Sequence, residues 1–280
     1  MSAGFLAEMA ATSAARLAAA RAQVSEGALQ ARALATPPPP PLALAASGFD
    51  LIAEVKLRSP AAGPLGGRME DLTRRVDEYA RGGAAAVSVL TEPLRFDGAL
   101  EHLASASAAL EPMRVPTMRK DFLIDPYQLL EARVAGAAGV LLIVRMLSGA
   151  QLDALVASAR ELELFALIEA FDETDIERAS DLIERGARAH GRLLVGLNCR
   201  DLDTLQVVPG RLEALAARLP ASVPRVAESG VASALDAARV AAAGYEVALV
   251  GGALMSAADP ATLTREMLAA GRRARGAAPA

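Results

Sequence analysis

The chain has 280 residues, of which 53% are hydrophobic, so it is long and apolar enough to build one large core. This composition excludes a disordered chain and a small disulfide-stapled module. The net charge of −4, the 3% of aromatic residues and the absence of tryptophan exclude a nucleic-acid-binding surface, which needs positive charge and rings that stack on bases.

Cysteine and histidine usage indicates the compartment and argues against a metal centre. Cys199 is the only cysteine, and the only histidines, His102 and His190, are far apart in the sequence. One cysteine cannot form an internal disulfide, and the three residues lack the spacing of zinc ligands. The sequence therefore predicts a protein of the reducing cytoplasm with no structural metal.

No segment predicts a membrane span or a signal peptide. The longest strongly apolar stretch, residues 134–144, has 11 residues, well short of the roughly 20 that a membrane helix needs. The N-terminus lacks a basic region and carries Glu8 where a signal peptide would be apolar. We therefore expect a soluble, cytoplasmic protein.

Residues 1–46 differ from the rest of the chain. Phe5, Leu6 and Met9, followed by alanine-rich sequence to Ala35, predict one or two helices, and the five prolines at 37–41 predict a stiff extended spacer. We expect an N-terminal helical extension at 1–46 and a catalytic domain at 47–280. Two roles are open for the extension: a lid that excludes water from the site, or a cap over apolar barrel surface.

Residues 47–280 alternate short β-rich runs with amphipathic helical stretches. The predicted strands are 51–56, 85–90, 115–119, 139–144, 164–169, 193–198, 224–228 and 247–251. Helical patterns occupy 71–81, 126–135, 148–162 and 172–185; Gly82, Gly136, Gly186 and Gly244 are expected as C-caps, and Asp259 with Pro260 is expected to open the last helix. Eight strand–helix pairs predict a (β/α)8 TIM barrel. A doubly wound open sheet is the alternative, but its glycine-rich dinucleotide turn is missing after the first strand.

Three rare residues mark the ends of predicted strands. Lys56 and Lys120 are the only lysines among 29 basic residues, and Asn198 is the only asparagine. Barrel enzymes keep their chemistry at the carboxyl ends of the strands. Because arginine does not release a proton near neutrality and lysine does so when desolvated, the two positions predict a chemical need for an ammonium group.

Carboxylates and glycines complete the predicted site. Glu54 and Glu169 alternate with apolar neighbours and are expected to point into the barrel mouth, and Glu228 ends the seventh strand. Glu54 lies two residues before Lys56 on the same strand, so an ion pair with that lysine and direct contact with substrate are both open. The turns Ser229-Gly230 and Gly251-Gly252 follow strands seven and eight, the usual phosphate position of this architecture.

The motifs from residue 49 onward resemble, in order, those of the indole-3-glycerol phosphate synthase family. They are IAEVK at 52–56 with Ser59-Pro60, MRKDF at 118–122, DPYQ at 125–128, GLN at 196–198, RDL at 200–202, AESG at 227–230 and LVG at 249–251. The helical extension before the first strand is also similar. Four residues depart from the family pattern: Ala61-Ala62 replace a usual Ser-Lys, Cys199 replaces a usual asparagine, and Gly252 replaces a usual serine or threonine.

The resemblance implies a reaction and roles for the site residues. The family converts 1-(2-carboxyphenylamino)-1-deoxyribulose 5-phosphate to indole-3-glycerol phosphate, with loss of CO₂ and water, in tryptophan biosynthesis. Lys120 is then the general acid, with a lowered pKa, and Glu169 the base. Lys56 and Arg200 hold the anthranilate carboxylate, and Glu54 orients Lys56 or Lys120. The implied reaction requires no redox cofactor and no metal. The implied substrate contacts are Ser59, Phe96, Phe122, Asn198, Arg200 and Glu228, and the implied phosphate contacts are Ser229, Gly230, Gly251 and Gly252.

Two other functions are consistent with the sequence. A phosphoribosylanthranilate isomerase would share the phosphate corner but would not need two lysines on strands one and three. A catalytically silent barrel kept for assembly would explain the altered first loop. The expected partner is the small phosphorylated substrate, with neither nucleic acid nor membrane, and the sequence leaves open whether the chain is a monomer or associates with other tryptophan-pathway enzymes.

Overall fold

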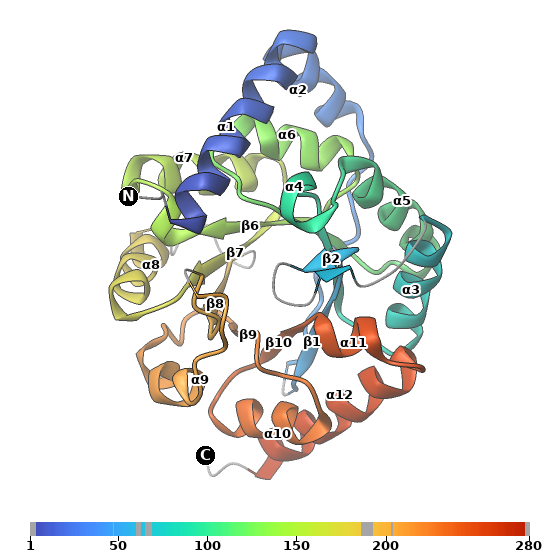
Figure 1. The fold of residues 1–280 in the computed structure, drawn as a ribbon, viewed down its shortest axis with the longest axis vertical. Helices are drawn as coiled ribbons and strands as arrows, with labels where there is room; N and C mark the ends of the chain where they lie inside the picture. The colour runs from blue at the N-terminus through green and yellow to red at the C-terminus, as the bar shows by residue number, and fades with distance from the viewer. Residues whose placement is uncertain are drawn as a thin grey trace.

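The computed structural model describes residues 4–46, 48–59, 63–64, 69–185, 193–202 and 204–277. Within this part of the chain, eight parallel strands close into a barrel in the order β1-β10-β9-β8-β7-β6-β5-β4 (Figure 1). The strands are β1 Asp50–Val55, β4 Ala86–Leu90, β5 Thr117–Lys120, β6 Gly139–Ile143, β7 Phe165–Ala170, β8 Leu193–Asn198, β9 Arg225–Glu228 and β10 Val247–Val250. Each predicted strand is confirmed to within two residues. A small antiparallel ladder, β2 Arg58–Ser59 with β3 Gly63–Pro64, was not predicted.

Helices surround the barrel and connect consecutive strands (Figure 1). The helices are α1 Phe5–Gln23, α2 Glu26–Ala35, α3 Met69–Arg81, α4 Pro93–Phe96, α5 Leu100–Leu110, α6 Pro126–Val134, α7 Gly149–Glu161, α8 Glu173–Arg185, α9 Arg211–Leu215, α10 Ala234–Ala242, α11 Gly252–Ser256 and α12 Pro260–Ala277, with 3-10 turns η1 Glu111–Met113, η2 Val144–Met146 and η3 Ala216–Arg218. The four predicted helices are all present, and α7 begins with a capping box formed by Ser148 and Gln151.

The predicted glycine C-caps are confirmed in part. Gly136 and Gly244 have φ angles of 84° and 104°, the left-handed conformation that glycine adopts at low cost. After α3, however, Gly83 and not Gly82 has the positive φ, at 93°. Gly186 lies outside the described residues. The prediction erred by one position because two successive glycines can each end a helix.

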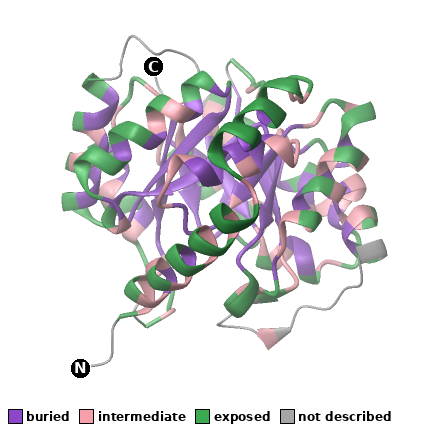
Figure 2. Cartoon of the chain, turned by 90° about the horizontal axis from the view of Figure 1, so that it is seen from above, coloured by how far each residue is buried: buried purple, intermediate pink, exposed green. Residues whose placement is uncertain are grey.

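The period of two along each strand divides the apolar side chains between two cores. In β1, Leu51, Ala53 and Val55 pack outward in a large cluster with the helices. Ile52 packs inward in a second cluster that fills the barrel. Figure 2 shows the resulting layers, with buried strands at the centre and the exposed residues on the outer faces of the helices. Glu54 has the same parity as Ile52, so the pleat points this carboxylate into the barrel.

The extension forms two helices, as expected, and residues 37–41 are in neither a helix nor a strand. Helix α1 packs against the barrel with Met9 and Ser13 fully buried, and Met9 belongs to the inner cluster. Helix α2 contributes Leu29 and Ala33 to the outer cluster. The extension therefore covers apolar surface, as a cap would, and also reaches the barrel interior, as a lid would. The domain division at residue 46 stays a prediction.

Among the described residues, no helix has the length and apolar character required to cross a membrane.

Candidate active site

The carboxyl ends of the strands enclose a cavity of about 360 Å³. The predicted catalytic residues Glu54, Lys56, Lys120 and Glu169 all line it. So do nine of the predicted contacts, which are Phe96, Phe122, Asn198, Arg200, Glu228, Ser229, Gly230, Gly251 and Gly252. These residues come from strands that are far apart in the sequence, and closure of the barrel brings their ends to one mouth. Lys56, Lys120, Glu169 and Asn198 thus converge on one mouth, as predicted, and the roles of the lining residues stay predictions.

Lys120 lies among three carboxylates. Its Nζ donates to Glu228 Oε2 at 3.1 Å and is 3.7 Å from Glu169 Oε1 and 3.8 Å from Glu54 Oε2. The carboxylates belong to β9, β7 and β1, so the ammonium lies where three inward-facing positions converge. Lys56 forms an ion pair with Glu54. Glu54 therefore contacts both lysines, which favours its orienting role.

The charge environment of Lys120 differs from the expected one. Burial by itself would lower the pKa of Lys120, but the negative charges of Glu228, Glu169 and Glu54 outweigh burial and raise this pKa. The expectation of a lowered pKa was therefore wrong for this structure, because the mouth around the ammonium is anionic and not cationic. Burial would likewise raise the pKa of Glu54, yet Lys56 and Lys120 bring it below its usual value. Both groups are charged near neutrality.

Glu228 is the unusual carboxyl group of the site. Burial and the neighbouring Glu169 raise its pKa well above the usual value, against the opposing effect of Lys120. Among the described residues, Oε1 of Glu228 has no hydrogen-bond partner although it is buried. Gly196 makes room for this oxygen, since a Cβ at that position would overlap it. Glu228 therefore binds a proton more readily than an ordinary carboxylate does.

Asn198 connects three other parts of the site. Its Nδ2 donates to Glu169 Oε1 at 2.9 Å, and its Oδ1 accepts from the backbone N–H of Arg200 at 2.9 Å and from Ser229 Oγ at 2.8 Å. Both polar atoms of the side chain thus contact protein groups. The predicted substrate contact stays a prediction, and the observed bonds indicate a role in orienting Glu169.

The loop after β8 forms one wall of the cavity. Leu202, Leu205 and Val207 line it, and Arg200 Nη1 donates to the Leu205 carbonyl at 2.6 Å. Leu205 has a φ of 60°, unusual for a residue with a side chain, and this conformation accompanies the bond to Arg200. Sequence reasoning missed these apolar residues because the direction of a loop side chain follows no period.

Aromatic rings form another part of the cavity lining. The Phe122 ring lies 6.3 Å from that of Phe96 and 5.8 Å from that of Phe5, measured between centroids. Such spacings are typical of favourable aromatic pairs. Phe5 belongs to α1, so the extension contributes a lining residue to the cavity.

The predicted phosphate corner combines two turns. Ser229 and Gly230 have φ angles of 63° and 69°, and Gly252 begins the short helix α11. Gly251 was expected to lie beside the phosphate, but in the structure it lies beside Glu54 and Lys56. A Cβ on Gly251 would overlap Glu54 Oε1 and lie 2.9 Å from Lys56 Nζ. The absence of a side chain at Gly251 therefore leaves room for the Glu54–Lys56 pair.

Some predicted positions cannot be placed in the cavity. The backbone of Ser59 lies in β2, but its side chain is outside the described part of the structure, as are Pro60, Ala61, Ala62 and His190. Cys199 is described and buried. Within the described ranges, no cluster of histidine, cysteine or carboxylate residues has the geometry of a metal site.

The fold defines a TIM-barrel enzyme, and lysine and glutamate side chains line the cavity at its mouth. A family model described as indole-3-glycerol phosphate synthase matches residues 6–267. Similar proteins with that name include one from Mycobacterium tuberculosis, 38% identical over 91% of this chain and 90% of its own, and one from Nocardioides, 44% identical over 79% of this chain and 81% of its own. Indole-3-glycerol phosphate synthase 1 of Streptomyces coelicolor is 40% identical over 82% of this chain and 81% of its own. The chain therefore belongs to the indole-3-glycerol phosphate synthase family.

Solved structures of other enzymes share the fold. 3-Hexulose-6-phosphate synthase from Salmonella typhimurium superposes with a TM-score of 0.61 at 16% identity, over 79% of this chain and 98% of its own. Thiamine phosphate pyrophosphorylase from Pyrococcus furiosus gives a TM-score of 0.58 at 16% identity, over 81% of this chain and 96% of its own. At such identities the likeness concerns the barrel alone.

Proposed function

We propose that the cavity converts 1-(2-carboxyphenylamino)-1-deoxyribulose 5-phosphate to indole-3-glycerol phosphate, CO₂ and water, with the residue roles given below. The chain is a lyase of tryptophan biosynthesis by its family membership. The observation that supports the roles is the contact of Lys120 with Glu228, Glu169 and Glu54 at the barrel mouth.

Ring closure needs an acid at the ketone of the substrate. The ring carbon that carries the carboxylate attacks the ketone carbon, a C–C bond forms, and the ketone oxygen takes a proton. Lys120 supplies this proton, because its ammonium is held charged at the centre of the mouth. Glu228 lies within hydrogen-bond distance of Lys120 Nζ and is placed to return a proton to it.

Decarboxylation needs a cation that holds the carboxylate until CO₂ leaves. Lys56 and Arg200 line the cavity and serve this role. The C–C bond to the carboxylate breaks, and its electron pair returns to the ring. The apolar lining formed by Phe122, Phe96 and the loop after β8 suits the anthranilate ring.

Dehydration needs an acid and a base. The hydroxyl leaves as water after it takes a proton from Lys56, and Glu169 removes a proton from the former ribulose carbon as the indole becomes aromatic. Asn198 orients Glu169 by donating a hydrogen bond from Nδ2 to Glu169 Oε1. Across the sequence of steps two protons enter the substrate and one leaves, which balances the loss of CO₂ from a carboxylate.

The phosphate is held at the turns after β9 and β10. Ser229, Gly230, Gly252 and Ala253 line this part of the cavity, and the first amides of a helix have no partner within the helix. Lys56 Nζ lies beside Gly251, 2.9 Å from where a Cβ on that residue would be, but it is held in the ion pair with Glu54. The backbone therefore supplies most of the phosphate contacts.

A serine at position 252 is expected to tighten phosphate binding. A Cβ on Gly252 meets no atom within 4 Å, so a hydroxyl fits there without rearrangement. Gly252→Ser should lower KM about fivefold at unchanged kcat, which corresponds to about 1 kcal/mol for one added hydrogen bond. Gly252→Ala supplies the Cβ without the hydroxyl and should leave KM as it is. An equal effect of both substitutions would argue against phosphate at this corner.

The reaction itself is tested by supplying the carboxyphenylamino substrate and following indole fluorescence. Turnover by the purified chain is the expected result. A folded chain without turnover would support the silent barrel, and turnover of phosphoribosylanthranilate alone would support the isomerase. The cytoplasmic location and the small phosphorylated substrate as partner are part of the same proposal, and the oligomeric state stays open.

A further inference from the structure

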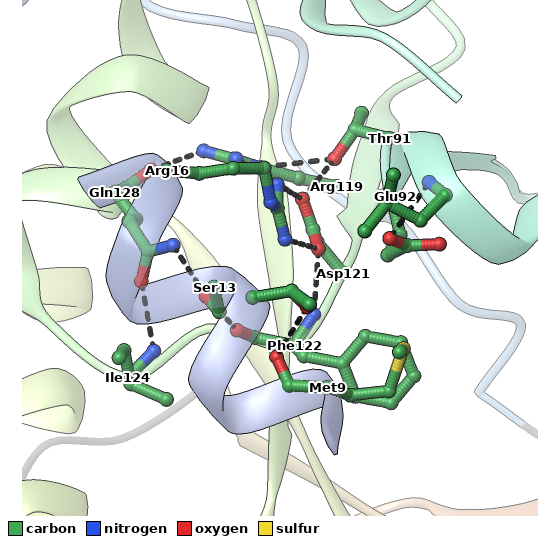
Figure 3. Close-up of polar contacts among 12 residues, drawn as sticks. Met9, Ser13, Arg16, Thr91, Glu92, Arg119, Asp121, Phe122, Ile124 and Gln128 are labelled. Carbon is green, nitrogen blue, oxygen red and sulfur yellow. Dashed lines mark hydrogen bonds and ion pairs between the residues drawn. The ribbon is translucent and has the colours of Figure 1, made fainter. Parts of the chain in front are cut away.

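A buried polar network joins the N-terminal extension to the residue that follows Lys120. Asp121 is 2% exposed, and both of its carboxylate oxygens face the Arg16 guanidinium of α1, with Nη1–Oδ2 at 2.9 Å and Nη2–Oδ1 at 2.8 Å. Figure 3 shows this two-pronged contact between helix α1 and the end of β5. Paired bonds of this kind fix orientation as well as distance.

The other bonds of Asp121 fix the backbone on both sides. Thr91 Oγ1 donates to Asp121 Oδ2 at 2.7 Å, and Arg119 Nη2 does so at 3.2 Å. The backbone N–H of Phe122 donates to Oδ1 at 2.8 Å. The N–H of Thr91 also donates to the carbonyl of Lys120 at 3.0 Å. Burial would raise the pKa of Asp121, but Arg16 and Arg119 lower it to about 2, so it is an anion throughout the working pH range.

Helix α1 makes a second connection one residue further on. Ser13 Oγ donates to the Phe122 carbonyl at 2.6 Å, and Gln128 Nε2 donates to Ser13 Oγ at 2.9 Å (Figure 3). Ser13 is fully buried. The segment that carries the acid Lys120 and the aromatic wall Phe122 is thus bonded directly to the extension.

We infer that Arg16 is a positioning residue, which acts through Asp121 to hold Lys120 and Phe122 in their places at the barrel mouth. This inference depends on the proposed role of Lys120. A lysine on a flexible stem among three carboxylates has several places to donate, and the fixed backbone at 120–122 selects among them. Displacement of a reacting group by about 1 Å can cost on the order of 100-fold in rate.

The test compares two arginines of the same helix. Arg16→Met removes both hydrogen bonds to Asp121 and keeps a side chain of similar apolar length. The Arg16 side chain is 27% exposed, so the substitution does not leave a cavity in the core. Arg21→Met is the matched control, since Arg21 tethers α1 to Asp125 at 2.8 Å without touching Asp121. We expect kcat to fall about 10- to 100-fold for Arg16→Met with KM within about threefold, and about twofold or less for Arg21→Met.

Three further measurements separate positioning from simple anchoring. Arg16→Lys should restore part of kcat, because one bond to Asp121 is regained. In an Asp121→Asn background, Arg16→Met should cause little additional loss, since both act through one contact. A lower melting temperature of Arg16→Met with wild-type kcat in the folded protein would overturn the inference. If the wild-type chain has no turnover, the proposed function fails; if Lys120→Arg is inactive while Arg16→Met is fully active, only this inference fails.

Discussion

Replacing Lys120 with arginine is expected to lower kcat by about 10² to 10⁴, the usual contribution of a general acid. Arginine keeps the positive charge among Glu228, Glu169 and Glu54, so the barrel mouth should remain folded and substrate should still bind. It cannot release a proton near neutrality, and its planar group does not fit the compact position of an ammonium. The measurements are kcat and KM from indole fluorescence and the thermal unfolding midpoint.

Separate values of kcat and KM for Lys120→Arg distinguish a catalytic role of Lys120 from a binding role. A loss confined to kcat identifies a group that acts in the transition state, whereas a rise in KM alone would make Lys120 a binding residue. Retention of more than about a tenth of the wild-type kcat would exclude Lys120 as the acid. A large loss of thermal stability would instead show that the arginine disturbs the three carboxylates.

Gly251→Ala is expected to have the second largest effect, a fall in kcat of about 10². The added Cβ would overlap Glu54 Oε1 and approach Lys56 Nζ to 2.9 Å, so the ion pair of these two side chains must move. Because Glu54 also lies 3.8 Å from Lys120, the disturbance reaches the acid. From the sequence alone, bulk at Gly251 would be expected to raise KM by obstructing the phosphate.

The neighbouring glycine provides the control for this prediction. Gly252→Ala adds the same methyl group one residue further on, where a Cβ meets no atom within 4 Å, and any effect should be confined to KM. A rise in KM for Gly251→Ala with unchanged kcat would indicate that Gly251 contacts the phosphate. It would contradict the prediction that the added Cβ displaces Glu54 and Lys56. Steady-state kinetics of the two variants, measured side by side, distinguish these outcomes.

The sequence by itself determined the barrel and the meeting of its two lysines with Glu54, Glu169 and Asn198 at one mouth. The period of two along each strand places Glu54 on the same face as Ile52 and opposite to Leu51, and the apolar runs between helical stretches locate all eight strands. Parallel strands end at a common mouth, so residues at the ends of the strands, Lys56, Lys120 and Asn198 among them, had to meet. Local patterns suffice here because side-chain direction in a strand follows from position.

The tertiary structure alone decided how the site residues act on one another. The sign of the Lys120 pKa shift depends on Glu54, Glu169 and Glu228, which three different strands bring within 4 Å of its ammonium. The Arg16–Asp121 contact joins residues 105 positions apart, and nothing in an alanine-rich helix signals it. Distances between side chains on different elements depend on barrel closure and helix docking, which no local period encodes. The sequence therefore predicts which groups gather at the mouth, and the packing determines the charge and position of each.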